Sequence, residues 1–477
     1  MATLSTRLAA IGLAASLTAC VAGPPPEVAT TTPQLPEVYT LAVDAQDAAS
    51  VDALLPSEDA GFVALSTTAL EKAPSLLEAI ARIEAARAGA RRAGAERLPN
   101  IGADASVTEN RINPNQFGSN NPFAQAIDTT QVSYGANITA RWDADLFGQL
   151  KAQERAAIAR IDAASAAASA VRLALLSEIA ASVVDWRALD ARTTAIESDV
   201  AAATRLAALA KTREDAGIAP GFDRVRAQAQ ASASRSRLAA LKSERARLLG
   251  RLVTLTSMNG AEVAAALSLP TNSPDLGSAP ASLPSQLLAN RPDVLAAAAE
   301  LAASDAELAA TARARFPRLT LSGVIGLLSF SPGDFFDEDS LVRTLTAGVA
   351  APLLDFGRIE AEIDGAAASK KVAFQAYRGA VFQALGDAEA AYGLVAAADE
   401  QAALATQERD ELERAANLAD DRYRAGLASF LEVLEARRAA DSSGERAAVA
   451  VAAAQRARII LWQALGGDAS TASNDPA

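Results

Sequence analysis

Histidine is absent from this chain of 477 residues, and cysteine occurs only once. These absences exclude the most common general base, the usual zinc ligands and any disulfide within the chain. Carboxylates or lysine could still support an enzyme, but the sequence contains no P-loop, no GxGxxG after a strand, no GxSxG and no carboxylate-rich metal motif. We therefore expect no catalytic residues, no metal site and no cofactor.

Aromatic residues are scarce, at 4% of the chain, and the hydrophobic fraction of 50% comes largely from Ala, Leu and Val. This composition suits closely packed helices. An excess of positive charge is also missing, since the net charge is −13. Affinity for nucleic acid comes mainly from an excess of Lys and Arg, so we expect no nucleic-acid partner.

The N-terminus has the pattern of a secretory signal peptide, with one positive charge at Arg7, a short apolar run, and Leu17-Thr18-Ala19 before Cys20. The apolar run is too short to span a bilayer. The sequence before Cys20 resembles a bacterial lipobox, in which the cysteine becomes the acylated first residue after residues 1–19 are removed. The plain alternative is a signal peptide with an incidental cysteine. We expect residues 20–70 to form a lipid-anchored tether and linker, extended where Pro and Thr are frequent.

One pattern occurs twice at the same spacing, which indicates an internal duplication. Gly148 and Gly217 are 69 positions apart, as are Gly357 and Gly426, and the second pair follows the first by 209 positions. Between each pair lies a stretch with few helix breakers. We expect long helices at 148–215 and 358–424, each roughly 100 Å long at 1.5 Å per residue.

Strict alternation of apolar and polar residues predicts a strand over 131–143, and the same pattern recurs near 100–110. We expect strand pairs at about 100–143 and about 318–354. Strands of about ten residues suit a tilted membrane span, although a half-buried sheet of a soluble protein gives the same pattern. Four strands cannot close a membrane barrel, so several chains must share it. Two chains would give eight strands and three would give twelve, and the residues alone do not choose.

Shorter helices are expected near 75–98, 222–256, 293–315 and 430–465, where apolar residues recur at helical spacing. The expected organisation has a first repeat at 71–260, an equatorial linker at 261–290 and a second repeat at 291–466. A disordered tail is expected at 467–477.

Three stretches carry a family resemblance: 290–294, 352–358, and 423–426 running on to 430–436. Through them the chain resembles the TolC-like outer-membrane efflux proteins, the outer membrane factor family, over about residues 70–466. Within that family it is similar to the lipoprotein subgroup that serves tripartite RND-type efflux systems. The resemblance implies a mainly α fold with a β membrane part. Each chain of a homotrimer would give four strands to a twelve-stranded barrel that continues into an α-helical coiled-coil periplasmic barrel.

The resemblance also implies a periplasmic gate at Tyr423, Glu432 and Glu435, with Asp223 at the position equivalent to Glu432 in the first copy. The plain alternative is that the acidic residues are solvated helix charges and that Tyr423 packs between helices. Turns at Gly217 and Gly426 would mark the tips where a periplasmic adaptor docks, and helix C-cap glycines are their plain alternative.

The resulting hypothesis is a passive exit duct in the outer membrane, supplied by a periplasmic adaptor and an inner-membrane pump. A coiled-coil envelope lipoprotein that does not conduct, or the duct of a type I protein secretion system, are the alternatives. A carboxylate-based hydrolase has no paired-acid site to support it. The sequence does not identify the substrate.

Overall fold

The computed structural model describes residues 27–31, 33–42, 45, 50–113, 130–218, 220–271, 279–282 and 284–467. The chain divides into two compact units. The strand unit contains 84–162 and 299–375 with the residues up to Thr31, and the helical unit contains 32–83, 163–298 and 376–477. Cys20, the tail after Gly467 and most of the first strand–strand loop lie outside the described residues.

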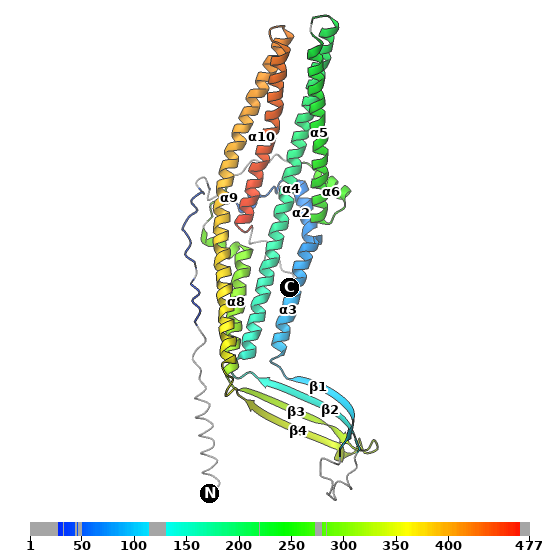
Figure 1. The fold of residues 1–477 in the computed structure, drawn as a ribbon, viewed down its shortest axis with the longest axis vertical. Helices are drawn as coiled ribbons and strands as arrows, with labels where there is room; N and C mark the ends of the chain where they lie inside the picture. The colour runs from blue at the N-terminus through cyan, green and yellow to red at the C-terminus, as the bar shows by residue number, and fades with distance from the viewer. Residues whose placement is uncertain are drawn as a thin grey trace. The chain divides into compact units, whose positions relative to one another are not determined.

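Figure 1 labels the main helices and strands. In chain order they are η1 (Val51–Leu54), α2 (Ala60–Lys72), α3 (Pro74–Ala95), β1 (Asn100–Arg111), β2 (Thr130–Ala144), α4 (Gln149–Asp215), α5 (Gly221–Thr256), α6 (Gly260–Leu267), η4 (Pro284–Gln286), α7 (Leu287–Asn290), α8 (Pro292–Ala312), η5 (Arg313–Arg315), β3 (Arg318–Ser329), η6 (Glu338–Ser340), β4 (Leu341–Ala350), α9 (Arg358–Arg424) and α10 (Phe430–Ala464). The two long helices each contain 67 residues and lie where the spacing of the glycines predicts them.

The four strands form one antiparallel sheet in the order β1-β2-β3-β4, which leaves β1 and β4 at its edges (Figure 1). The pairing of β2 with β3 joins the two sequence copies, with Ala136 opposite Leu327. The registers place the even-numbered residues of β2 on the same face as the odd-numbered residues of the other strands. Exposed large apolar side chains on that face are Ile101, Val107, Ile138, Trp142, Ile325, Leu341, Leu345 and Val349. This face is suited to contact lipid.

An aspartate begins each long helix, although it stands at a different position in each copy. Asp145 accepts from the backbone N–H groups of Leu150 and Lys151, at 3.1 and 2.8 Å. In the second copy, the N–H groups of Ile359 and Gly357 donate to Asp355 and hold the pKa of that exposed carboxyl below its ordinary value. Each aspartate supplies acceptors for N–H groups that have no partner inside the helix.

Only α4, among the helices in the described residues, is long and apolar enough to cross a membrane by length and composition, with a stretch of mean hydropathy 1.6. Its central apolar residues pack inside the helical unit, where Leu175, Ile179 and Val183 are at most 5% exposed. This packing explains why the stretch is apolar.

The expectation that residues 20–70 are a tether and linker is wrong for the C-terminal part of that range. Asp59 caps α2 by accepting from the N–H groups of Gly61 and Phe62. Phe62 and Leu65 then pack with α4 and α5 in one core of the helical unit. Tyr39 is also buried, against Tyr392 of α9. Apolar residues at helical spacing after a capping aspartate stabilise this segment as a folded part of the helical unit.

The expected linker at 261–290 likewise begins as a helix. Asn259 and Glu262 form a capping box at the start of α6, each side chain bonded to the backbone N–H of the other. Val263 and Leu267 of α6 are buried in the same core as α2. The cap and two buried side chains are enough to fix this short helix.

Candidate gate and docking site

The α4–α5 and α9–α10 hairpins end in turns of the same type. At each turn a glycine has a positive φ, +73° at Gly217 and +76° at Gly426. The N–H of Leu427 donates to the carbonyl of Arg422 at 2.7 Å, and that of Gly426 donates to Tyr423 at 3.0 Å. The N–H groups of Ile218 and Gly217 make the equivalent bonds to Arg213 and Glu214. This is the Schellman motif, in which a residue without Cβ takes the left-handed position, so both glycines are C-cap residues.

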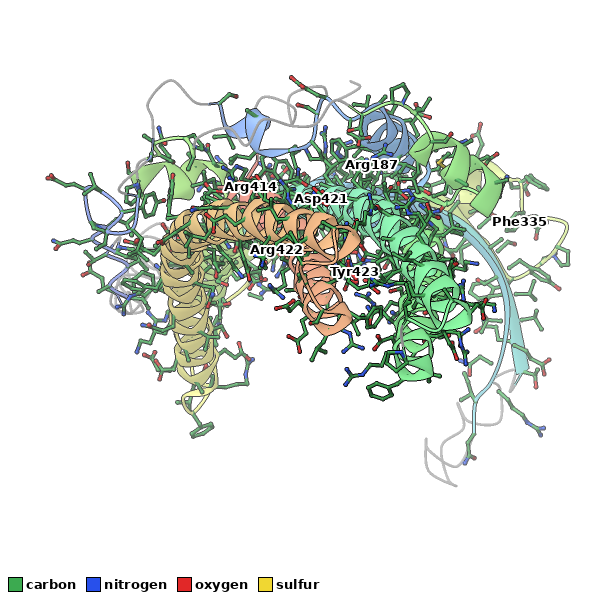
Figure 2. The ribbon with its side chains drawn as sticks, turned by 90° about the horizontal axis from the view of Figure 1, so that it is seen from above. Arg187, Phe335, Arg414, Asp421, Arg422 and Tyr423 are labelled. Carbon is green, nitrogen blue, oxygen red and sulfur yellow. The ribbon has the colours of Figure 1, made fainter. Side chains whose placement is uncertain are left out.

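Tyr423 lies in the core that joins the two hairpins next to their turns. It is 4% exposed and packs with Ala210 of α4, Ala227 of α5 and Phe430 of α10. Its ring meets that of Phe430 edge on, with 6.1 Å between centroids. Figure 2 shows Tyr423 directed between the hairpins. Within one chain Tyr423 therefore holds the four helices together.

Arg213 is a contact of Tyr423 that the sequence analysis missed. Its guanidinium lies over the Tyr423 ring, with Cζ 4.7 Å from the ring centroid. Such a cation over an aromatic face is attracted by the ring's negative face. The sequence contains an indication of this residue, since Arg213 occupies the last turn of the helix before Gly217, as Arg422 does before Gly426. The pair links α4 of the first copy with α9 of the second.

Glu432 is part of a capping box at the start of α10. The N–H of Ser429 donates to Glu432 Oε2 at 2.7 Å, and the N–H of Glu432 donates to Ser429 Oγ at 3.3 Å. Asp223 occupies the same third position of α5, but the residue before that helix is Pro220, which makes no side-chain cap. Both carboxylates are favoured by the positive end of the helix dipole. Glu435, one turn further along α10, is exposed.

Apolar residues are exposed at both tips. Ile218 and Phe222 are 68% and 61% exposed, and Leu427 and Leu431, at the equivalent positions of the second copy, are 70% and 43% exposed. Exposed apolar side chains grouped beside tight turns are typical of an interaction surface. No group of three or more Cys, Asp or Glu side chains that could hold a metal ion occurs in the part of the chain that the structure describes.

Comparison with protein families assigns the class. The family model described as outer membrane efflux protein matches residues 65–257 and 283–467, most of both sequence copies. The chain therefore belongs to the outer membrane efflux protein family, whose members are outer-membrane channels. Membership confirms the predicted family and the predicted location in the outer membrane.

The names of individual relatives refer to different exported compounds. The chain is 30% identical to the pyoverdine export outer membrane protein OpmQ of Pseudomonas aeruginosa, over 84% of this chain and 83% of the relative. It is 30% identical to the outer membrane protein OprJ of the same species, over 86% and 84%. Identity to the solvent efflux pump outer membrane protein SrpC of Pseudomonas putida is 27%, over 87% of each. The similarity in each case spans both repeats.

Solved structures confirm the fold class. The outer-membrane channel OprN matches with a TM-score of 0.84 at 24% identity, covering 93% of this chain and 99% of the other. The outer membrane protein VceC of Vibrio cholerae matches with a TM-score of 0.78 at 25% identity, covering 87% and 98%. The mainly α fold with four membrane strands is therefore the fold of the family.

Proposed function

We propose that this chain forms, as a homotrimer, the exit duct of a tripartite efflux pump, and that it conducts passively what an inner-membrane RND-type pump and a periplasmic adaptor deliver. Membership of the outer membrane efflux family over both repeats is the observation that carries the proposal. The test is ion conduction by the purified protein in a planar bilayer. A coiled-coil tether of the envelope would not conduct, so an inactive but folded protein would favour that alternative.

The internal duplication supports closure of the barrel between chains. β3 stands 218 positions after β1, and the long helices stand 209 positions apart. Applying the same offsets to the β2–β3 register, where Asn137 lies opposite Gly326, places Thr346 of β4 opposite Thr108 of a neighbouring chain's β1. The two exposed edges would then pair with each other, which satisfies their backbone groups in lipid.

The first prediction tests this register. Thr108→Cys combined with Thr346→Cys is expected to cross-link neighbouring chains with a short thiol-reactive linker, because facing residues of paired strands have Cβ atoms about 5 Å apart. The largest covalent species on a denaturing gel reports the number of chains. Three linked chains support the homotrimer, whereas two would support an eight-stranded barrel.

The matched control moves one cysteine by a single residue. Val107→Cys with Thr346→Cys places the two thiols on opposite faces, because successive side chains of a strand alternate. The variants with a single introduced cysteine show how much of the cross-linking involves the native Cys20. Equal cross-linking of the 107 and 108 variants would contradict the proposed register.

We further propose that Tyr423, Glu432, Glu435 and Asp223 belong to the periplasmic gate. Three chains would place three copies of the exposed Glu435 at the same level, and a ring of carboxylates favours cations in a pore. Because Glu432 also caps α10, its replacement must preserve the cap. Gln does so while removing the charge.

The second prediction follows from this choice. Glu432→Gln with Glu435→Gln is expected to lower cation selectivity and cation block in planar bilayers, without lowering the thermal stability of the protein. Glu262→Gln makes the same change in the capping box of α6 and is expected to leave conduction unchanged. Unaltered selectivity in the double variant would remove both residues from the gate.

Two features complete the proposal. The apolar tips around Gly217 and Gly426 would dock the periplasmic adaptor, supported by the exposure of Ile218 and Leu427. Acylation of Cys20 would anchor the N-terminus to outer-membrane lipid, supported by the lipobox-like sequence before it. The relatives' names include pyoverdine export and solvent efflux, so we assign substrate choice to the pump.

A further inference from the structure

Three carboxyl groups and one arginine meet between helices of the two hairpins. Asp199 comes from α4, Arg237 from α5, and Asp441 and Glu445 from α10. Their side chains are 15%, 34%, 10% and 25% exposed, in that order. Nη1 of Arg237 lies 2.8 Å from Glu445 Oε1, whereas its Nη2 lies 4.0 Å from Asp199 and 3.9 Å from Asp441. Arg237 thus pairs closely with Glu445 alone. The carboxyl groups of Asp199 and Asp441 share a largely buried space.

Asp199 and Asp441 require a proton between them. Oδ2 of Asp199 is buried, and no group in the described residues donates to it. Its neighbour is the carboxyl of Asp441, since Oδ2 of each residue lies within 4.0 Å of the same Nη2 of Arg237. Two carboxylates offer only acceptors, so they can be joined by a hydrogen bond only when one of them is protonated. Three carboxyl groups share one arginine in this largely buried space, and such crowded like charges cannot all ionise at ordinary cost.

Burial, together with the neighbouring carboxyl of Asp441, raises the pKa of Asp199 to about 8. Arg237 acts in the opposite direction, and Glu445 raises the pKa further. The proton belongs to the Asp199–Asp441 pair rather than to either residue alone. Near neutral pH one proton therefore remains at Asp199 and lowers the negative charge of the pair, whereas an exposed aspartate is fully ionised there.

The second sequence copy supplies an internal comparison. Glu408 and Arg446 stand 209 positions after Asp199 and Arg237, and they form a simple ion pair at 2.6 Å with side chains 47% and 51% exposed. Ser232 and Ser236 stand 209 positions before Asp441 and Glu445. The added acids are therefore a feature of α10, and they convert an ordinary ion pair into a proton-sharing contact between α4 and α10.

Two of the remaining cations around the pair, Arg424 and Arg437, are engaged elsewhere. A cavity of about 150 Å³ beside Asp199 and Asp441 is also lined by Arg205 of α4, by Asp420 and Arg424 of α9, and by Arg437 of α10. Asp420 lies 2.7 Å from Arg424 and 4.0 Å from Arg437, so it forms ion pairs with two of these cations. The polar lining of the cavity gives water a path to the pair once a proton leaves.

We propose that the proton shared by Asp199 and Asp441 is a latch that holds α10 against α4, and that its loss as pH rises releases α10 and favours the open periplasmic end of the duct. This proposal rests on the proposed function as a duct. The closed state binds one proton more per chain than the open state, in which both aspartates are exposed. The open fraction of the duct therefore increases as pH rises above the ordinary pKa of aspartate. The increase ends once the pH exceeds the raised pKa of Asp199 in the closed state. Each chain contributes at most about a tenfold shift of the equilibrium per pH unit.

The test measures open probability of the reconstituted protein in planar bilayers, with the pH on the helical side varied between about 5 and about 9. Wild type is expected to open increasingly across this range. Asp199→Asn is expected to stay closed and independent of pH, because its amide donates to Asp441 permanently. Glu408→Gln changes the equivalent acid of the second copy and is expected to keep the wild-type profile.

A second readout does not depend on conduction. The infrared carbonyl band of a protonated carboxylic acid is expected in wild type at neutral pH, and it should disappear in Asp199→Asn and in Asp441→Ser. A pH-independent wild type, or an Asp199→Asn variant that retains the profile, would overturn the latch. Absence of conduction in every variant at every pH would instead overturn the duct, while the infrared band would still test the shared proton.

Discussion

Gly326→Ala is expected to prevent assembly of the protein in the outer membrane. Gly326 lies in β3 opposite Asn137 of β2. A Cβ atom added there would lie closer than 3.0 Å to the carbonyl oxygen of Ala136 and to Asn137 Oδ1, an approach that real Cβ atoms do not make. A flexible side chain could turn away, but the carbonyl belongs to the neighbouring strand's backbone. The methyl group therefore forces β2 and β3 apart.

The position of this clash makes its effect large. Overpacking alone costs about 1–3 kcal/mol, and each ladder hydrogen bond broken in an apolar surrounding adds to that cost. Within the described sheet, the β2–β3 pairing is the connection between the two strand pairs. We expect loss of the heat-modifiable oligomer on mild denaturing gels, and loss of the protein from outer-membrane fractions.

A matched control lies on the same strand. A Cβ atom added at Gly323 would be 3.9 Å from the nearest atoms of Leu345 and Thr344, which is ordinary contact. Gly323→Ala is therefore expected to assemble like wild type. Normal assembly of Gly326→Ala, or equal failure of both variants, would contradict this account of the β2–β3 contact.

The parts of the fold that the sequence predicts are those governed by local chemistry. Alternation over 131–143 predicts β2 because side chains of a strand alternate regardless of its partners. The glycines at 217 and 426 predict helix ends because a left-handed residue without Cβ completes the last turn. Both signals are read within a few residues, and the duplication shows each of them twice.

Contacts between distant residues were not predictable in the same way. Nothing near Gly326 indicates that the backbone of Ala136 passes close to it. The helix Ala60–Lys72 could be predicted from its sequence, since Asp59 precedes apolar residues at helical spacing. It was missed because the whole of residues 20–70 was interpreted as a tether and linker. A single offset of 209 also fails for the strands. The loop after β1 contains 18 residues and the loop after β3 contains 11, and β1 and β3 begin 218 positions apart.

The candidate gate was predicted only in part. Tyr423 and Glu432 follow from the resemblance, but their contacts with Arg213 and Ser429 depend on how two hairpins and a helix start are packed. Asp199 and Asp441 are 242 positions apart and belong to no recognisable motif. A carboxyl pair of this kind becomes visible only when α4 and α10 are placed side by side.

Arg291→Met is expected to destabilise the helical unit clearly more than the loss of an exposed ion pair does. The residue precedes α8 and lies in 290–294, one of the three stretches that carry the family resemblance. It is 8% exposed and donates to both oxygens of Asp293, at 3.0 and 2.6 Å. It also donates to Asp387 of α9 at 3.0 Å and to the carbonyl of Ala464, at the end of α10, at 3.1 Å. One guanidinium thus joins three helices.

Removing one partner of a fully buried ion pair leaves the other charge uncompensated and costs about 3–5 kcal/mol. The side chains of Asp293 and Asp387 are 42% and 37% exposed, so water screens part of the lost charge and the cost of Arg291→Met lies below that range. Burial alone would raise the pKa of Asp293, but the hydrogen bonds and charge of Arg291 hold it below its ordinary value. That contribution to stability is complete above the ordinary aspartate pKa and is lost as pH falls through the lowered value. Arg291→Met is therefore expected to lower the thermal midpoint most at neutral pH, and the difference from wild type should shrink in acid.

Two further variants separate this network from a general effect of lost charge. Arg82→Met removes an exposed partner of Glu78, with side chains 73% and 65% exposed, and is expected to change stability by less than about 0.5 kcal/mol. Arg291→Lys keeps the charge but has no planar fork to reach Asp293, Asp387 and Ala464 at once, so it should recover only part of the loss. Full recovery by lysine would show that charge alone holds α8, α9 and α10 together. Partial recovery is expected, because the geometry of the guanidinium sets where these helices meet.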